Sequence, residues 1–258
     1  MPSRIEGKWA VITGASAGIG AATALELAEE GCRLVLGARR MDRLAELKSK
    51  LEARFPGRDV RAVALDVADP ASCAAFIEVA RAAGPIEILV NNAGLARGAD
   101  KLVQASDAAW TEMIDTNVLG LLRLTRGLLP DMIARKSGTI VNVGSVAALE
   151  PYGGGTVYCA TKAAVRAVSK ALRHELLGSN VRVTTVEPGA VETEFSVVRF
   201  GGDRDRAKHV YRGFTPLVAQ DVAEVIRFVC SRPQHVVLEE VTMYPVAQAS
   251  TTAYHREP

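Results

Sequence analysis

Cysteine pairs, long apolar runs and an excess of charge of one sign are all missing from this chain of 258 residues. Its cysteines, Cys32, Cys73, Cys159 and Cys230, lie far apart without a CxxC pair, which argues against a zinc cluster or a disulfide framework. No apolar run approaches the roughly 18 residues of a membrane span, and the N-terminus lacks an apolar secretion segment. We therefore expect reduced thiols, no bound metal, no membrane partner and a cytoplasmic location.

The charge balance and composition exclude further classes. The formal net charge is +2, and local charged runs such as 203–206 carry both signs, so nothing indicates a nucleic-acid partner. With 48% hydrophobic and 23% charged residues, the chain is typical of globular proteins rather than disordered or fibrous ones. No linker or shift in composition interrupts it, so we predict a single domain over residues 1–258.

Short apolar runs alternate with longer amphipathic segments along the whole chain. The predicted strands are Trp9–Thr13, Leu34–Gly37, Val60–Leu65, Ile86–Asn91, Thr139–Val143, Val181–Val186 and Val236–Val241. Segments with a helical pattern between them include Ala21–Glu30, Arg43–Arg54, Ala71–Ala82, Trp110–Ala134 and Thr156–Leu177. This alternation predicts an α/β fold of the Rossmann type, a doubly wound parallel sheet of about seven strands with helices on both faces. The one long irregular stretch, from Pro188 to about Thr215, predicts a substrate lid over residues 189–215.

A glycine-rich turn follows the first predicted strand and leads into a helix. It contains Gly14, Ser16, Ala17, Gly18, Ile19 and Gly20. Glycines let the backbone approach a ligand closely, and a helix N-terminus presents unpaired N–H groups to an anion. The turn therefore predicts a site for a dinucleotide's pyrophosphate, the alternative being glycines that only permit a tight turn.

The end of the second predicted strand indicates which nicotinamide cofactor fits. NAD-preferring sites place an acidic residue there, whereas this chain has Arg39 and Arg40. Two guanidinium groups can bind a 2′-phosphate, so the residues favour NADP(H). The alternative is that both arginines simply face solvent.

Three residues predict proton transfer coupled to hydride transfer. Tyr158 and Lys162 lie four residues apart in a predicted helix and so share one face, and Ser145 follows a predicted strand at the ligand-binding edge of the sheet. A phenol is a poor base at neutral pH, but a nearby ammonium would lower its pKa. Tyr158 could then exchange a proton with a substrate oxygen that the Ser145 hydroxyl orients.

Over its whole length the chain resembles the short-chain dehydrogenases/reductases. The matching segments are residues 13–20, Asp66-Val67, residues 91–94, Asn117, Ser145, residues 158–162 and Pro188-Gly189. The resemblance implies that Asp66 and Val67 hold the adenine, and that Asn91, Ala93 and Gly94 line the ribose side. It also implies that Pro188, Gly189 and Tyr158 bind the cofactor, that Val191 and Thr193 contact its carboxamide, and that Lys162 binds its nicotinamide ribose. Asn117 would anchor a water that passes protons from Lys162.

Segments of the C-terminal half look like the NADP-dependent 3-hydroxy acid dehydrogenases, which oxidise serine and allo-threonine. These segments are residues 150–155, 187–189, 193–200 and 244–248. A small 3-hydroxy acid such as serine, allo-threonine or 3-hydroxybutyrate needs a carboxylate anchor, and Arg199 is the candidate. The alternatives for Arg199 are an ion pair with Glu192 or Glu194, or solvent exposure. The loop over 189–194 departs from the bacterial pattern, which leaves the substrate open.

Two other functions stay open from the sequence: a reductase of a bulkier aldehyde or ketone, and a catalytically silent NADP(H)-binding sensor. The alanine-rich helix at 156–177 and the leucine-rich helix from Trp110 offer surfaces for close helix packing. Burial within one subunit explains part of both patterns. The family resemblance favours a homodimer or homotetramer built on these helices.

Overall fold

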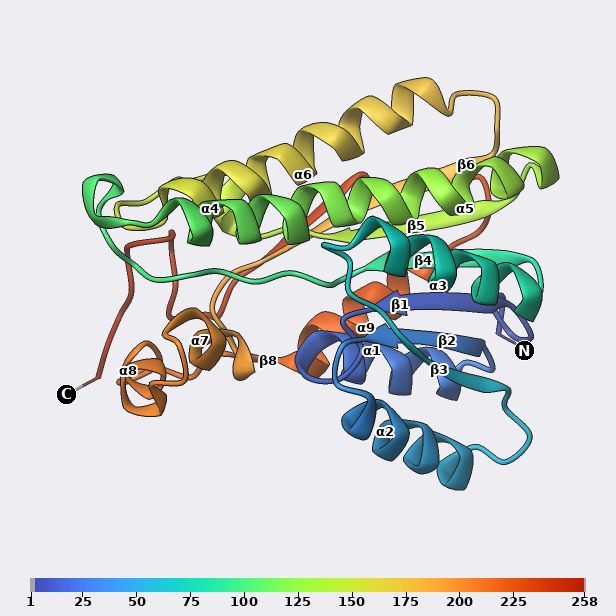
Figure 1. Cartoon of the computed structure of the whole chain (residues 1–258), viewed down its shortest axis with the longest axis horizontal. Helices are drawn as coiled ribbons and strands as arrows, with labels where there is room; N and C mark the ends of the chain where they lie inside the picture. Colours follow the sequence, from blue (N-terminus) through green and yellow to red (C-terminus); the bar gives the residue numbers. More distant parts are fainter. Residues whose placement is uncertain (1–2, 258) are drawn as a thin grey trace.

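A parallel sheet of seven strands forms the centre of the computed structural model, which describes residues 3–257 (Figure 1). Met1, Pro2 and Pro258, the ends of the predicted domain, lie outside the described residues. The strands are β1 (Trp9–Thr13), β2 (Arg33–Ala38), β3 (Val60–Ala64), β4 (Ile86–Asn91), β5 (Gly138–Val143), β6 (Val181–Pro188) and β9 (Glu240–Met243). Their order is β3-β2-β1-β4-β5-β6-β9, and every neighbouring pair is parallel. The predicted fold class is confirmed.

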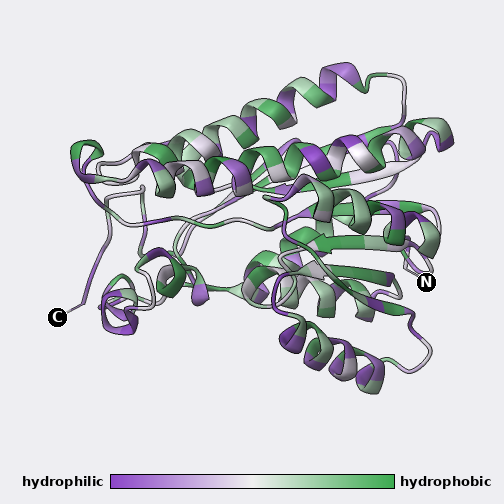
Figure 2. Cartoon of the chain, viewed as in Figure 1, coloured by the Kyte–Doolittle hydropathy of each residue, from purple (hydrophilic) through white to green (hydrophobic). Residues whose placement is uncertain are grey.

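Two layers of helices cover the sheet because successive strand residues point to opposite faces. Ala10 and Ile12 of β1 pack in one core with α1 (Gly18–Glu29), α2 (Met41–Arg54) and α9 (Ala219–Cys230). Trp9 and Val11 pack in the other core with α3 (Pro70–Ala83), α5 (Leu121–Arg135) and the end of α6 (Thr156–Glu175). Figure 2 shows hydrophobic strands between helices whose outer faces are hydrophilic. The apolar runs are therefore strands buried on both faces.

The last predicted strand, Val236–Val241, was placed too early. Only Glu240–Met243 pairs with β6. Upstream, the N–H of Val236 donates to the carbonyl of Pro233, and its own carbonyl accepts from the guanidinium of Arg182 at 3.1 Å. These contacts take the backbone of that apolar stretch out of the sheet.

The predicted helix Trp110–Ala134 divides into three parts. They are α4 (Asp107–Ile114), a π-helical turn η2 (Asp115–Gly120), and α5. The π-helical turn contains Asn117 and ends at Gly120. Gly120 packs closely against the loop after β3: a Cβ at Gly120 would lie 2.7 Å from the Cβ of Val67. Such turns are common at functional sites. Helix α9, which packs against α1, was not among the predicted helices.

The stretch from Pro188 to Thr215 is not irregular, and that part of the prediction is wrong. It contains β7 (Val191–Glu192), α7 (Glu194–Arg199) and α8 (Arg204–His209), and β7 pairs with β8 (Leu217–Val218). Both short helices have their own caps: the side chain of Thr193 accepts from the N–H of Phe195, and Asp203 accepts from Arg206. The segment lies beyond the carboxyl ends of the strands (Figure 1). Within residues 3–257, no helix is long and apolar enough to cross a bilayer.

Candidate active site

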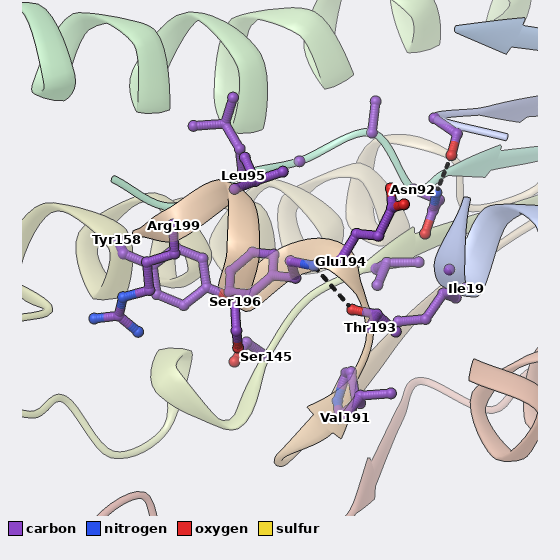
Figure 3. Close-up of a pocket in the computed structure, with 18 of the residues that line it drawn as sticks. Ile19, Asn92, Leu95, Ser145, Tyr158, Val191, Thr193, Glu194, Ser196 and Arg199 are labelled. Carbon is purple, nitrogen blue, oxygen red and sulfur yellow. Dashed lines mark hydrogen bonds between the residues drawn. The ribbon is translucent and has the colours of Figure 1, made fainter. Parts of the chain in front are cut away.

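A pocket of about 540 Å³ opens at the carboxyl edge of the sheet, in the size range of small-molecule sites. Loops after six parallel strands line it, together with α7 and part of the C-terminal segment. The predicted site residues that line it are Gly14, Ser16, Ala17, Gly18, Ile19, Arg39, Arg40, Asp66, Val67, Ala93, Gly94, Ser145, Tyr158, Lys162, Pro188, Gly189, Val191, Thr193 and Arg199. Gly20, Asn91 and Asn117 are not among its lining residues. Figure 3 shows Tyr158, Ser145 and Arg199 on one side and Ile19 and Asn92 on the other.

The glycine turn has the geometry of an anion cradle. Gly14 and Gly18 have φ of +66° and +55°, a conformation that glycine adopts without strain. A Cβ at Gly14 would lie 2.9 Å from the Cα of Ala93, and one at Gly20 would lie 2.5 Å from the carbonyl of Gly14. Helix α1 starts at Gly18, and its N-cap residue Ala17 makes no side-chain hydrogen bond to the first turn. The helix N–H groups therefore face the pocket free for a phosphate, and the turn fits a dinucleotide.

The arginines after β2 are not simply solvated. Arg39 and Arg40 both line the pocket, and Arg40 donates to the hydroxyl of Ser16 from Nε at 3.3 Å and from Nη2 at 3.2 Å. Arg40 also donates to Glu194 at 2.8 Å, and Arg43 donates to the same carboxylate at 2.6 Å. Arg39, Arg40 and Arg43, which form an arginine cluster, carry the positive charge that a 2′-phosphate requires.

Asn92, rather than Asn91, faces the cofactor side. Asn91 lies behind the pocket wall, where its amide nitrogen donates to Thr125 and Asn142 at 2.9 Å. Asn92 lines the pocket and donates to the carbonyl of Thr13 at 2.9 Å, and the N–H groups of Asn92 and Ala93 donate to the Thr13 hydroxyl. These bonds fix the glycine turn against the loop after β4. The strand alternation that buries Asn91 could have indicated this difference.

Asn117 lies next to the pocket without lining it. Its Oδ1 accepts from the N–H of Leu95 at 2.9 Å, and its Nδ2 donates to the carbonyl of Leu95 at 2.8 Å and to Thr161 at 3.0 Å. A Cβ at Gly94 would lie 3.3 Å from Oδ1 of Asn117 and 3.5 Å from Nζ of Lys162. Asn117 therefore holds the loop after β4 against α6, close to the lysine.

Ser145, Tyr158 and Lys162 meet in the pocket as the sequence predicts. Ser145 lies two residues after the end of β5 and is the N-cap of the short 3₁₀ helix η3 (Val146–Ala148). Tyr158 and Lys162 lie on the buried face of α6. Burial raises the pKa of Tyr158 above its ordinary value, while the Ser145 hydroxyl beside it acts in the opposite direction. The three side chains are buried, so the substrate oxygen would meet them away from bulk water.

The pKa of the Tyr158 phenol is raised and not lowered as predicted, because burial is the largest influence on it. The ammonium nitrogen of Lys162 donates to the carbonyl of Val143 at 2.8 Å and lies 5.9 Å from the centre of the Tyr158 ring. Burial lowers the pKa of Lys162 to about 8, and the carboxylate of Glu187 opposes that shift. Desolvation is the largest influence on the pKa of both side chains.

A buried carboxyl group that the sequence analysis did not single out lies under this trio. Glu187, near the end of β6, is 0% exposed and accepts a hydrogen bond from the backbone N–H of Ser145. A Cβ at Gly144 would overlap its carboxyl group, so that glycine permits the contact. Burial raises the pKa of Glu187 to about 7, while the bond from Ser145 and the charge of Lys162 oppose the rise.

The substrate side of the pocket centres on α7. Arg199 donates from Nε to the carbonyl of Gly98 at 2.7 Å and from Nη1 to the hydroxyl of Tyr152 at 3.0 Å. The ring of Phe195 packs 5.6 Å from that of Tyr158. Further lining residues that the sequence analysis left without a role are Tyr152, Phe195, Ser196, Tyr211, Gln248 and Tyr254. Arg199 therefore faces the pocket, and the ion pairs with Glu192 or Glu194 considered from the sequence are not formed, since Glu194 pairs with Arg40 and Arg43.

Comparisons with known proteins agree with this geometry. The profile of the family described as "short chain dehydrogenase" matches residues 8–200. The chain belongs to this family. It is 42% identical over 257 residues to an NADP-dependent 3-hydroxy acid dehydrogenase of Schizosaccharomyces pombe, covering 99% of both chains. It is also 44% identical over 244 residues to a sulfoacetaldehyde reductase of Chromohalobacter salexigens, covering 92% of this chain and 94% of the relative.

A solved relative shares the same architecture. The closed form of a serine dehydrogenase complexed with NADP⁺ superposes with a TM-score of 0.88 at 41% identity. The match covers 96% of this chain and 100% of that one. Relatives with different substrates thus share one scaffold, and the residues of the pocket must distinguish them.

Proposed function

We propose that this protein is an NADP(H)-dependent dehydrogenase that interconverts the hydroxyl and carbonyl forms of a small 3-hydroxy acid. The observation that carries the proposal is the set of residues that line one continuous pocket. The arginine cluster and glycine turn lie at one end, and Ser145, Tyr158, Lys162 and Arg199 lie at the other. The names of the 3-hydroxy acid and serine dehydrogenases among the relatives support it.

Each end of the pocket holds a different part of the cofactor. The backbone of residues 14–20 binds the pyrophosphate, and Arg39 and Arg40 bind the 2′-phosphate. Asp66 and Val67 line the adenine side, and Asn92, Ala93 and Gly94 line the ribose side. Pro188, Gly189, Val191 and Thr193 border the nicotinamide end, and Lys162 reaches its ribose. When bound, NADP(H) supplies or accepts the hydride at the substrate carbon.

Side chains of α6 and of the loop after β5 carry out the proton transfer. During oxidation the Tyr158 side chain, as its phenolate, takes the proton of the substrate hydroxyl, and during reduction its hydroxyl gives a proton to the substrate oxygen. The Ser145 hydroxyl donates a hydrogen bond to the same substrate oxygen and orients it. Lys162 exchanges protons with solvent through a water held near Asn117, whose carbonyl oxygen keeps an acceptor site beside its bond to Leu95.

The carboxylate of the substrate binds Arg199. This guanidinium is fixed by Gly98 and Tyr152 and faces the same pocket as Tyr158. A charged acceptor would replace the neutral phenol oxygen as its partner and form a stronger bond. Because Arg199 belongs to α7, the segment 189–215 acts as the lid that encloses the substrate.

A substrate panel tests the proposal. Serine, allo-threonine, 3-hydroxybutyrate and simple alcohols are each mixed with NADP⁺ or NAD⁺, and the absorbance of the reduced cofactor is followed. We expect turnover of the 3-hydroxy acids with NADP⁺ and little with NAD⁺. Turnover of uncharged alcohols alone would contradict the substrate class. Tight NADP⁺ binding without turnover of any compound would indicate a silent sensor.

A second candidate is a reductase of another aldehyde or ketone. The similarity to a sulfoacetaldehyde reductase favours it, because a sulfonate, like a carboxylate, can present two anionic oxygens to a guanidinium. The same panel run with NADPH and sulfoacetaldehyde separates the two. Preference for the sulfonate would replace the 3-hydroxy acid in the proposal.

We also propose that the chain forms a homodimer or homotetramer through α4, α5 and α6. Leu122 on α5 and Ile114 on α4 are 38% and 44% exposed, so both offer apolar surface to another subunit. The exposed alanines of α6 are Ala160, Ala163, Ala167 and Ala171. Light scattering should give a mass of two or four chains, and the mass of one chain would overturn this.

A further inference from the structure

Glu194 joins the arginine cluster to the lid. One carboxylate oxygen lies 2.8 Å from Nη1 of Arg40, and the other lies 2.6 Å from Nη1 of Arg43. These hydrogen bonds hold the pKa of Glu194 below its ordinary value, with the bond from Arg40 the largest cause. Nε and Nη2 of Arg40 each donate to the Ser16 hydroxyl. An internal carboxylate thus accepts from Nη1 of Arg40, a donor that an external anion could use.

The same residue begins the helix that forms the substrate side of the pocket. Glu194 is the first residue of α7, directly after its cap Thr193. The next residue, Phe195, packs against Tyr158, and the helix ends at Arg199. A helix of only six residues therefore contacts both the arginine cluster and the catalytic tyrosine.

We propose that Glu194 occupies the place of the cofactor's 2′-phosphate on Arg40, and that binding of the phosphate releases Glu194 and the first turn of α7. This inference rests on the proposed use of NADP(H). A phosphate monoester carries close to two negative charges and three acceptor oxygens, so it competes with a carboxylate for the same guanidinium. The cofactor's adenosine end would thereby control the helix at the substrate end.

The exposure of the three side chains sets how strongly Glu194 competes. Arg40, Arg43 and Glu194 are 43%, 45% and 41% exposed. Ion pairs this exposed are weak and are screened by salt. A contact this weak is one that a phosphate, which carries more negative charge than a carboxylate, can displace.

Binding of nucleotide fragments tests the competition directly. Calorimetry on the intact protein compares 2′,5′-ADP with 5′-ADP, which lacks the 2′-phosphate. We expect Glu194→Gln to tighten the binding of 2′,5′-ADP by about three- to tenfold, less at high salt, and to leave 5′-ADP unchanged. Glu192→Gln is the matched control, because it removes the same charge from an exposed residue of β7 two positions away. It should leave both affinities unchanged.

The outcomes separate this inference from the proposed function. If wild-type protein binds the two fragments equally, the preference for NADP(H) itself fails. If wild-type protein prefers 2′,5′-ADP but Glu194→Gln binds it no more tightly, or more weakly, only the role of Glu194 is overturned. Weaker binding would mean that Glu194 positions the arginines for the phosphate instead of competing with it.

Release of the helix has a readout of its own. Hydrogen exchange of the amides of residues 194–199 should speed up when 2′,5′-ADP is added, and should not change with 5′-ADP. In Glu194→Gln the exchange should already be faster without any fragment. Equal exchange under all these conditions would overturn the coupling between the two ends of the pocket.

Discussion

The carboxylate of Glu187 accepts a hydrogen bond from the backbone N–H of Ser145, so the end of β6 holds the serine that follows β5. Oε2 makes this bond, whereas Oε1 is buried with no hydrogen-bond partner among residues 3–257. The charged groups that influence this carboxyl are Lys162, Glu240 and Arg166. A buried acid with a half-satisfied carboxylate gains from binding a proton, and this gives the protein a pH dependence that can be measured.

The first prediction concerns stability. Burial raises the pKa of Glu187 from an ordinary 4.5 to about 7, so the folded chain binds a proton more tightly than the unfolded chain. The resulting stabilisation is fully present below pH 4.5 and is lost as pH rises through 7. We expect the free energy of unfolding of wild type, relative to Glu187→Gln, to fall by up to about 3 kcal/mol across this window.

Urea denaturation at intervals between pH 4.5 and 8 measures this difference. Glutamine keeps an acceptor for the Ser145 N–H but does not titrate, so it isolates the proton's contribution. Glu240→Gln, which changes a carboxyl on the adjacent β9, serves as the comparison. A constant difference between wild type and Glu187→Gln over the whole range would show that Glu187 titrates normally.

The second prediction concerns the phenol. Tyr158→Phe should lower kcat by about 10²- to 10⁴-fold, because the proton of the substrate hydroxyl loses its acceptor. The phenyl ring keeps the packing against Phe195, so stability should change little. Binding of 2′,5′-ADP, which lacks the nicotinamide, should match wild type. Turnover close to wild type would remove Tyr158 from the proposed mechanism.

The third prediction concerns the charge of Lys162. Burial lowers its pKa to about 8, so the ammonium form is present below that pH and is lost above it. If the ammonium supplies protons during reduction, kcat/KM for the carbonyl substrate should fall as pH rises through about 8. Because the Glu187 carboxylate stabilises the ammonium, Glu187→Gln should move this fall to lower pH. A profile that is flat up to pH 10, or unmoved by Glu187→Gln, would contradict the assignment.

Local patterns were enough to predict six of the seven strands of the sheet and the glycine turn after the first of them. The strand ending at Thr13 and the glycine turn after it follow from apolar runs and from φ angles that only glycine tolerates well. A spacing of four residues places Tyr158 and Lys162 on one face of any helix that contains both. These predictions depend on residues that are neighbours in the sequence.

Predictions failed where distant residues decide the outcome. Glu187 contacts Ser145 at a sequence separation of 42 residues, and Glu194 contacts Arg40 at a separation of 154 residues. No short spacing in the sequence indicates either contact. Helices α7 and α8 are too short to show an apolar period, and their caps alone indicate where they start. The predicted lowering of the phenol's pKa failed for a related reason, because the burial that raises this pKa depends on the whole fold.

The last prediction concerns Arg199 and the substrate's charge. Arg199→Ala should raise KM for serine or 3-hydroxybutyrate by about tenfold or more, because an anion in a half-buried pocket loses its charged partner. KM for an uncharged alcohol should change much less. Tyr152→Phe is the matched control, since it removes the hydroxyl that Arg199 contacts at 3.0 Å while keeping the guanidinium. Steady-state kinetics of both variants on a charged and an uncharged substrate therefore separate recognition of the carboxylate from the placement of α7. Equal effects of Arg199→Ala on the two substrates would assign Arg199 to the structure of the lid, because the carbonyl of Gly98 and the hydroxyl of Tyr152 would then be its relevant partners.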